Sequence, residues 1–74
     1  MENKPRKKYV CIAKVDNGVN SSFVKYRCND LQNFIQFITK RYNVFYFNAF
    51  SNTGSNRGLM MFTWGSKKGL QSAT

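Results

Sequence analysis

Histidine is absent from this 74-residue sequence, and acidic residues are scarce. The three carboxylates belong to Glu2, Asp16 and Asp30, which are scattered along the chain. Acid–base catalysis usually needs paired carboxylates or imidazoles, and metal sites draw their ligands from the same residue types together with cysteine. The sequence therefore predicts a protein that is not an enzyme, with no catalytic residue, no metal site and no cofactor.

Cysteine is almost as scarce, since Cys11 and Cys28 are the only two. A short secreted chain that is held together by disulfides usually has four or more cysteines, so two favour a cytosolic protein. The cysteines lie on either side of a predicted hairpin, which makes a disulfide geometrically conceivable. Two buried thiols that act as small apolar side chains are the interpretation we favour.

Long apolar runs are missing as well. The apolar segment at residues 9–13 follows a basic start but ends at Lys14, which is shorter than the roughly 7–15 residues of a signal-peptide core. No segment approaches the roughly 20 residues that cross a membrane. We therefore expect a soluble protein that is not exported and stays in the cytoplasm, or in the host cytoplasm if a phage encodes it.

Positive charge and aromatic side chains are abundant instead. Twelve Lys and Arg against three acids give a net charge of +9, while 42% of the residues are hydrophobic and 16% are aromatic. This composition is too apolar for a disordered basic tail, and the length suits one small domain. We expect a flexible basic arm at residues 1–8, a folded domain at 9–64 and a polar, mobile tail at 65–74.

Four segments rich in β-branched and aromatic residues are typical of strands. They cover residues 9–15, 22–27, 44–50 and 59–64. The turn sequence Asp16-Asn17-Gly18 joins the first two segments into a hairpin. The polar loop at 51–58 connects the last two, which we expect to pair as antiparallel strands.

A helix is predicted between the two pairs of strands. Its apolar side chains recur at helical spacing, at Leu31, Phe34, Ile35, Ile38 and Tyr42. We expect Asn29 to cap its start and Asn43 to end it in a left-handed conformation. The sequence thus predicts a small two-layer α+β domain, in which one amphipathic helix covers one face of a four-stranded antiparallel sheet in the order strand–strand–helix–strand–strand.

The other face of that sheet must meet water, a second copy of the chain or a ligand. Alternation divides segment 44–50 into one side with Phe45, Phe47 and Ala49 and another with Val44, Tyr46, Asn48 and Phe50. It divides segment 59–64 into one side with Leu59, Met61 and Thr63 and another with Met60, Phe62 and Trp64. Neither side is polar enough to suit water, which predicts an interaction surface.

Nucleic-acid binding explains these features together, because aromatic rings stack on unpaired bases while Lys and Arg neutralise phosphates. The stacking candidates are Tyr46, Phe50, Phe62, Trp64 and Tyr26. The candidate phosphate contacts are Lys14, Lys25, Arg27, Lys40, Arg41 and Arg57, with Lys4, Arg6, Lys7 and Lys8 on the arm. Each residue also has a structural alternative: the rings as core, Lys40 and Arg41 as helix-end charges, Arg57 as a solvated loop residue.

A protein partner is the alternative to nucleic acid. From Leu31 to the C-terminus the chain has basic residues but no acidic one, and such a field also attracts an acidic protein surface. The adjacent pair Met60-Met61 is typical of adaptable contact surfaces. A regulator or inhibitor from a phage or mobile element fits this alternative, and a homodimer through the open face or an edge strand would also hide the apolar side chains.

Overall fold

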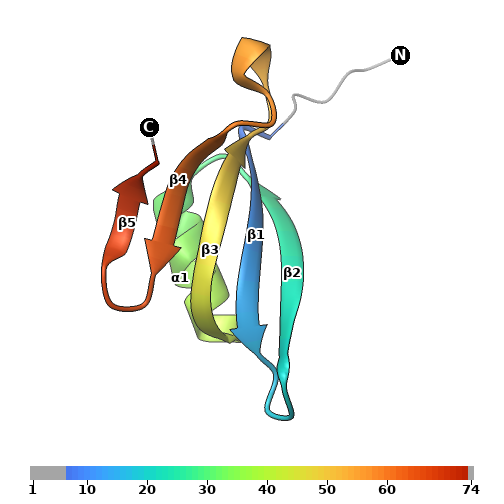
Figure 1. Ribbon diagram of the computed structural model, residues 1–74, viewed down its shortest axis with the longest axis vertical. Coiled ribbons are helices and arrows are strands. Elements are labelled where there is room, and N and C mark those ends of the chain that lie inside the picture. Colours follow the sequence, from blue (N-terminus) through green and yellow to red (C-terminus); the bar gives the residue numbers. More distant parts are fainter. Residues whose placement is uncertain (1–6, 74) are drawn as a thin grey trace.

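The computed structural model describes residues 7–73, which form a five-stranded sheet with one helix on one of its faces (Figure 1). The elements in chain order are β1 (Tyr9–Asp16), β2 (Ser21–Cys28), α1 (Leu31–Arg41), β3 (Asn43–Ser51), the short 3-10 helix η1 (Gly54–Asn56), β4 (Met60–Gly65) and β5 (Gly69–Ser72). Residues 1–6 of the expected basic arm, which include Lys4 and Arg6, and the terminal Thr74 lie outside the described residues.

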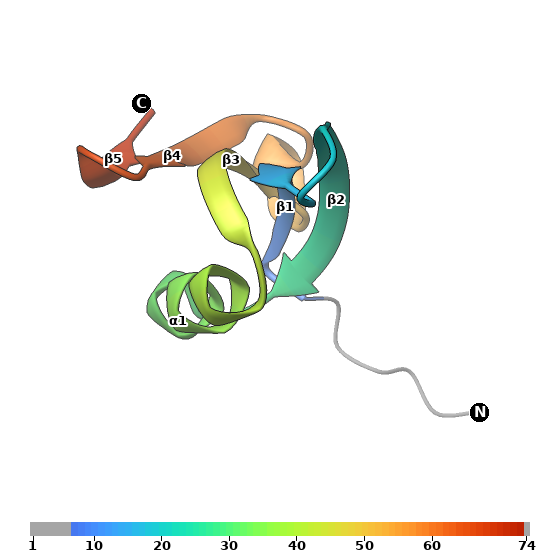
Figure 2. The same cartoon turned by 90° about the horizontal axis from the view of Figure 1, so that it is seen from below.

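The strands lie in the order β2-β1-β3-β4-β5, and every neighbouring pair is antiparallel. Both β2 and β3 pair with β1, so the connection through α1 crosses over β1 on one side of the sheet (Figure 2). The prediction of an α+β domain with one helix and an antiparallel sheet is confirmed. Within residues 7–73, no helix is long and apolar enough to cross a membrane.

The prediction of four strands is wrong, because β5 adds a fifth within the segment that was expected to be a tail. The chain turns at residues 66–68, and Gly69 begins the strand with a φ of 76°, a conformation that glycine adopts without strain. Leu70 then lies opposite Trp64 of β4. Since Leu70 is the only large apolar residue in this short strand, the sequence shows no alternation that would have revealed it.

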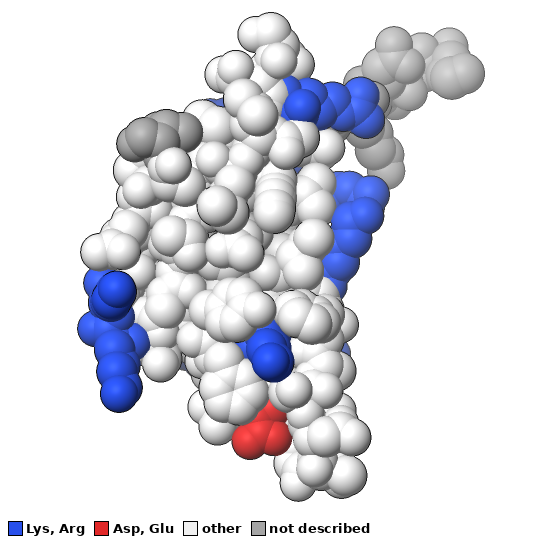
Figure 3. Space-filling view, viewed as in Figure 1, with Lys and Arg blue, Asp and Glu red and all other residues white. Residues whose placement is uncertain are grey.

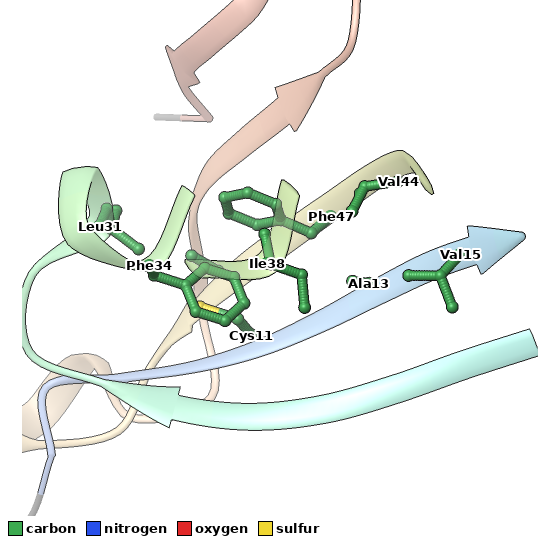
Figure 4. Packing of buried hydrophobic residues seen from close by; sticks show 9 residues of the cluster. Cys11, Ala13, Val15, Leu31, Phe34, Ile38, Val44 and Phe47 are labelled. Atoms are coloured by element: carbon green, nitrogen blue, oxygen red, sulfur yellow. The ribbon is translucent and has the colours of Figure 1, made fainter. Parts of the chain in front are cut away.

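The core lies between α1 and the face of the sheet that α1 covers (Figure 4). Its buried members are Cys11, Ala13 and Val15 of β1, Leu31, Phe34 and Ile38 of α1, and Val44, Phe47 and Ala49 of β3. The side chains from β1 are small, which leaves room for the larger rings from α1 and β3. The Phe34 and Phe47 rings meet edge to face with their centroids 5.0 Å apart.

The helix begins one residue later than expected, because Asp30 and not Asn29 is its cap. The Asp30 Oδ1 atom accepts from the backbone N–H groups of Gln32 at 2.9 Å and Asn33 at 3.3 Å. Asn29 instead accepts from the backbone N–H of Lys8. The predicted left-handed stop at Asn43 is also wrong, since Asn43 is the first residue of β3 and pairs with β1.

A bulge in β3 reverses the predicted sides of its first two residues. Lys14 lies opposite Tyr46 and Val15 lies opposite Val44, so Phe45 is the extra residue between these pairs. Val44 is therefore 6% exposed on the covered face, whereas Phe45 is 46% exposed. Strict alternation predicted the opposite grouping of both residues.

A second bulge lies where β3 meets β4. Phe62 lies opposite Ala49 and Met60 lies opposite Phe50, so Met61 is the extra residue. Met60 therefore lies on the other face from Phe62, although alternation predicted that the two share a side.

Candidate nucleic-acid interface

The face of the sheet opposite α1 is covered by no other element of residues 7–73 (Figure 2). We call it the open face. Residues directly opposite each other in an antiparallel pair point to the same side, so the strand registers identify its side chains. They are Val10, Ile12, Lys14 and Asp16 of β1, Ser21, Phe23, Lys25 and Arg27 of β2, Asn43, Tyr46, Asn48 and Phe50 of β3, Met60 and Thr63 of β4, and Gln71 of β5.

The central feature of the open face is a lysine between two aromatic rings. Lys14 of β1 lies directly opposite Phe23 of β2 on one side and Tyr46 of β3 on the other. Its Nζ atom is 5.9 Å from the centroid of the Phe23 ring. Phe23 is 62% exposed and Tyr46 is 38% exposed, so both rings are available to a ligand.

Further cations and half-buried side chains surround this group. Lys25 and Arg27 follow Phe23 at alternate positions of the edge strand β2, and both are exposed. Ile12 and Phe50 are half-buried and add apolar surface to the same face. Figure 3, which views this face, shows a basic side chain among uncharged groups with one acidic side chain just below it, and further basic groups toward the edges.

Acidic charge is almost absent from the same surface. Asp16, at the end of β1, is the one acidic residue on the strands among residues 7–73, and its Oδ1 atom accepts from the backbone N–H of Gly18 at 2.9 Å. This hydrogen bond holds the carboxylate at the β1–β2 turn. The open face therefore presents mainly positive charge to a ligand.

Two of the expected stacking rings, Trp64 and Phe62, lie on the covered face instead. Trp64 stacks on Phe47 with ring centroids 5.6 Å apart and an angle of 11° between the planes. Phe62 meets Tyr9 edge to face at 6.0 Å. Tyr46 and Phe50 thus share the open face with Lys14, whereas Trp64 and Phe62 do not.

Tyr26 also lies on the covered face, where it connects β2 with α1. Its ring is 5.4 Å from that of Phe37, and its hydroxyl shares a hydrogen bond of 3.2 Å with the hydroxyl of Tyr42. The Arg41 guanidinium carbon is 5.8 Å from the centroid of the Tyr42 ring. Hydrogen bonding to Tyr26 and the Arg41 charge lower the pKa of Tyr42.

The remaining expected cations lie outside the open face. Lys40 and Arg41 are in the last turn of α1, where positive charge suits the negative end of the helix dipole. Arg57 is exposed in the loop after η1, where its backbone N–H donates to the Gly54 carbonyl at 3.3 Å. The structure therefore does not bring these three cations together with Lys14.

Lys7 and Lys8 precede β1 and are held through their backbones. The buried Asn52 donates from its backbone N–H to the Lys8 carbonyl and from Nδ2 to the Lys7 carbonyl, both at 2.9 Å. The Lys8 backbone N–H donates to Asn29 Oδ1 at 2.9 Å. These bonds set the direction in which the chain enters the sheet and leave both lysine side chains exposed.

The sequence-based list of stacking rings omitted Phe23. The signal was present, because Phe23, Lys25 and Arg27 occupy alternate positions of one strand and must share a face. A face with two cations is rarely buried, so a ring on that face had to be exposed. The charged residues on the same side of the strand were therefore a better indicator that the Phe23 ring is exposed than the presence of an aromatic side chain.

Comparison of this chain with protein-family models, with the curated proteins and with the solved structures finds no match.

Proposed function

We propose that this protein binds single-stranded nucleic acid across the open face of its sheet. Phe23 and Tyr46 stack on two bases, and Lys14 between them contacts a phosphate of the strand that connects those bases. Lys25 and Arg27 contact further phosphates along β2. The observation that carries this proposal is the position of Lys14 directly opposite two exposed rings on its two neighbouring strands.

The preference for single strands follows from what the rings need. A ring stacks on a base only where the face of that base is free, and duplex stacking occupies those faces. Each stacked base contributes about 1–3 kcal/mol, while each phosphate contact adds a term that weakens as salt rises. Two rings and three cations on the open face therefore supply both a salt-resistant and a salt-sensitive contribution.

The test measures fluorescence anisotropy of end-labelled oligonucleotides, with single strands and duplexes of the same sequence at low and moderate salt. We expect tighter binding of single strands and a preference that survives in part at the higher salt. Trp64 is not a suitable reporter, because it packs on Phe47 on the covered face. Binding that ignores strandedness and disappears with salt would contradict stacking and show only attraction between a basic chain and polyanions.

Variants connect the binding to the named rings. Tyr46→Ala and Phe23→Ala should each weaken single-strand binding by about 1–3 kcal/mol, because each removes one stacking platform. Phe37→Ala is the matched control, since Phe37 is 46% exposed but lies on α1, on the other side of the sheet. An equal loss in all three variants would show that the rings of the open face have no special role.

An acidic protein surface is the second candidate partner. Met60 is 43% exposed opposite Phe50, and a flexible thioether next to a ring suits an adaptable protein contact. The protein would then bind a defined acidic protein in a lysate treated with nuclease. Loss of every bound protein after that treatment would contradict this candidate.

A further inference from the structure

Two thiols lie close together on the covered face. Cys28 lies opposite Tyr9 and Cys11 lies opposite Tyr26, so the cysteines are diagonal neighbours on the adjacent strands β1 and β2. Their Sγ atoms are 3.7 Å apart. We infer that Cys11 and Cys28 are a reversible modification site, which a small-molecule disulfide such as oxidised glutathione converts into a disulfide within the chain.

The positions of the two sulfurs favour this bond. A disulfide has its sulfurs about 2.05 Å apart and its Cα atoms about 4.4–6.8 Å apart, whereas diagonal neighbours of an antiparallel pair are about 7–8 Å apart. The observed separation of 3.7 Å already brings the two sulfurs close to contact. Because Cys28 is the last residue of β2, a small shift of this strand end together with side-chain rotation closes the remaining distance without a new strand register.

Only one of the two thiols is accessible to a reagent. Cys11 is fully buried, whereas Cys28 is half-buried and lines an open pocket of about 390 Å³. Lys7 and Arg27 line the same pocket. Asp30 lines the pocket too, but the two cations outnumber this one carboxylate and attract the carboxylates of oxidised glutathione. Because Cys11 is fully buried, Cys28 is the residue that the reagent meets first.

The reaction proceeds by two thiol–disulfide exchanges. The Cys28 thiolate attacks one sulfur of oxidised glutathione, which forms a mixed disulfide and releases one glutathione thiolate. Cys11 then loses its proton to that thiolate or to solvent, and its sulfur attacks Sγ of Cys28 and expels the second glutathione. The two protein thiols are oxidised by two electrons, and one oxidised glutathione is reduced to two glutathione thiols.

The environment of the pair makes this exchange slow at neutral pH. Burial raises the pKa of Cys28, and Asp30 at the helix start acts in the same direction, while the neighbouring Cys11 thiol and the Lys7 charge act against it. Burial likewise raises the pKa of Cys11. Since the thiolate is the nucleophile, the rate rises with pH. The site therefore behaves as a slow structural switch and not as a rapidly cycling redox centre.

The test treats the reduced 74-residue chain with oxidised glutathione at mildly alkaline pH. We expect the titratable thiols in denaturant to fall from two per chain to none, with the mass lower by two hydrogen atoms and migration as a monomer on a non-reducing gel. The bond closes a loop between residues 17 positions apart, which should raise the melting temperature on the order of 10 °C. Dithiothreitol should reverse all of these changes.

Single-cysteine variants identify the order of the steps. In Cys11→Ala the remaining Cys28 should stop at the glutathione adduct, and in Cys28→Ser the buried Cys11 should stay unmodified. Two free thiols in the wild-type protein at equilibrium, a stable glutathione adduct or a cross-linked dimer would overturn the inference. These wild-type outcomes decide the matter even if a variant does not fold.

The inference does not rest on the proposed nucleic-acid binding, although Arg27 is used in both proposals. Both sulfurs lie on the covered face, and the thiol count is read without any oligonucleotide.

Discussion

The two faces of the sheet use the same kinds of side chain in opposite ways. On the covered face, the Phe47 ring contacts the rings of Phe34 and Trp64. On the open face, Lys14 lies between Phe23 and Tyr46, and both rings are exposed. Tyr46 and Phe47 are neighbours in the chain, yet one is available to a ligand and the other is fully buried. Aromatic composition therefore does not distinguish core from interface.

Charge separates the two faces more clearly than aromatic content does. The cations of the sheet strands among residues 7–73, namely Lys14, Lys25 and Arg27, all lie on the open face. Burial of a charge without a partner costs several kcal/mol, so these residues cannot turn toward α1. The alternate positions of these cations therefore determine which side of β1 and β2 faces away from the helix.

The largest expected difference between the faces is in stability. Phe47→Ala should lower the free energy of unfolding by about 3–5 kcal/mol, because it leaves a cavity against Phe34 and Trp64. Tyr46→Ala should lower it far less, since that ring is partly exposed. Urea denaturation of both variants checks this, and similar losses would show that the open-face ring is also part of the core.

A smaller effect is expected for Trp64→Ala, which tests whether a half-buried ring on the covered face takes part in binding. Its packing on Phe47 predicts a loss of about 2 kcal/mol in the free energy of unfolding. The affinity of the folded variant for single strands should not change. Weaker binding at unchanged stability would place Trp64 in the interface.

The register at the β3 bulge can be tested by replacing Val44 and Phe45, one at a time, with threonine. Val44→Thr should cost about 1–2 kcal/mol, because it buries a hydroxyl group in the core. Phe45→Thr should cost less, since Phe45 is largely exposed. Thermal unfolding of the two variants compares them, and a larger loss for Phe45→Thr would contradict the register.

The smallest effect is expected from removing the charge of Lys14. Lys14→Gln should reduce the slope of log Kd against log salt by about 0.7, the contribution of one phosphate contact to a single strand. Lys40→Gln is the matched control, because Lys40 lies at the end of α1 away from the open face. Titrations at several salt concentrations measure both slopes. Equal reductions would mean that Lys14 acts only through net charge.

Local patterns were sufficient for much of the fold. The helical spacing of Leu31, Phe34 and Ile38 predicted the helix and its buried side, and all three are buried in the core. The turn at residues 16–18 predicted the first hairpin, which the structure contains. The helical spacing and the turn sequence each involve residues close together in the chain, and those same residues form the helix and the hairpin.

Long-range pairing was not predictable in the same way. Nothing local to β5 marks it as a strand, because it forms only when β4 offers a free edge beside it. The bulges at Phe45 and Met61 depend on the neighbouring strand, since a bulge is a mismatch between two partners. For the same reason alternation placed Val44 and Met60 on the wrong sides.

The candidate site was predicted in part. Lys14, Lys25, Arg27, Tyr46 and Phe50 were proposed from the sequence and share the open face. Trp64, Lys40, Arg41 and Arg57 were proposed with them, yet the structure places them elsewhere. Residue type selected all nine, but only the register of β1 with β2 and β3 shows which of them are neighbours.

The sequence by itself determined a small basic domain, the helix and four of the five strands, because periodicity and turn chemistry act over a few residues. It also determined that one face of the sheet would lack a helix. Only the tertiary structure decided which face this is and which rings lie on it. Alternation defines two sides of a strand but does not name the covered one, and each bulge exchanges the sides beyond it.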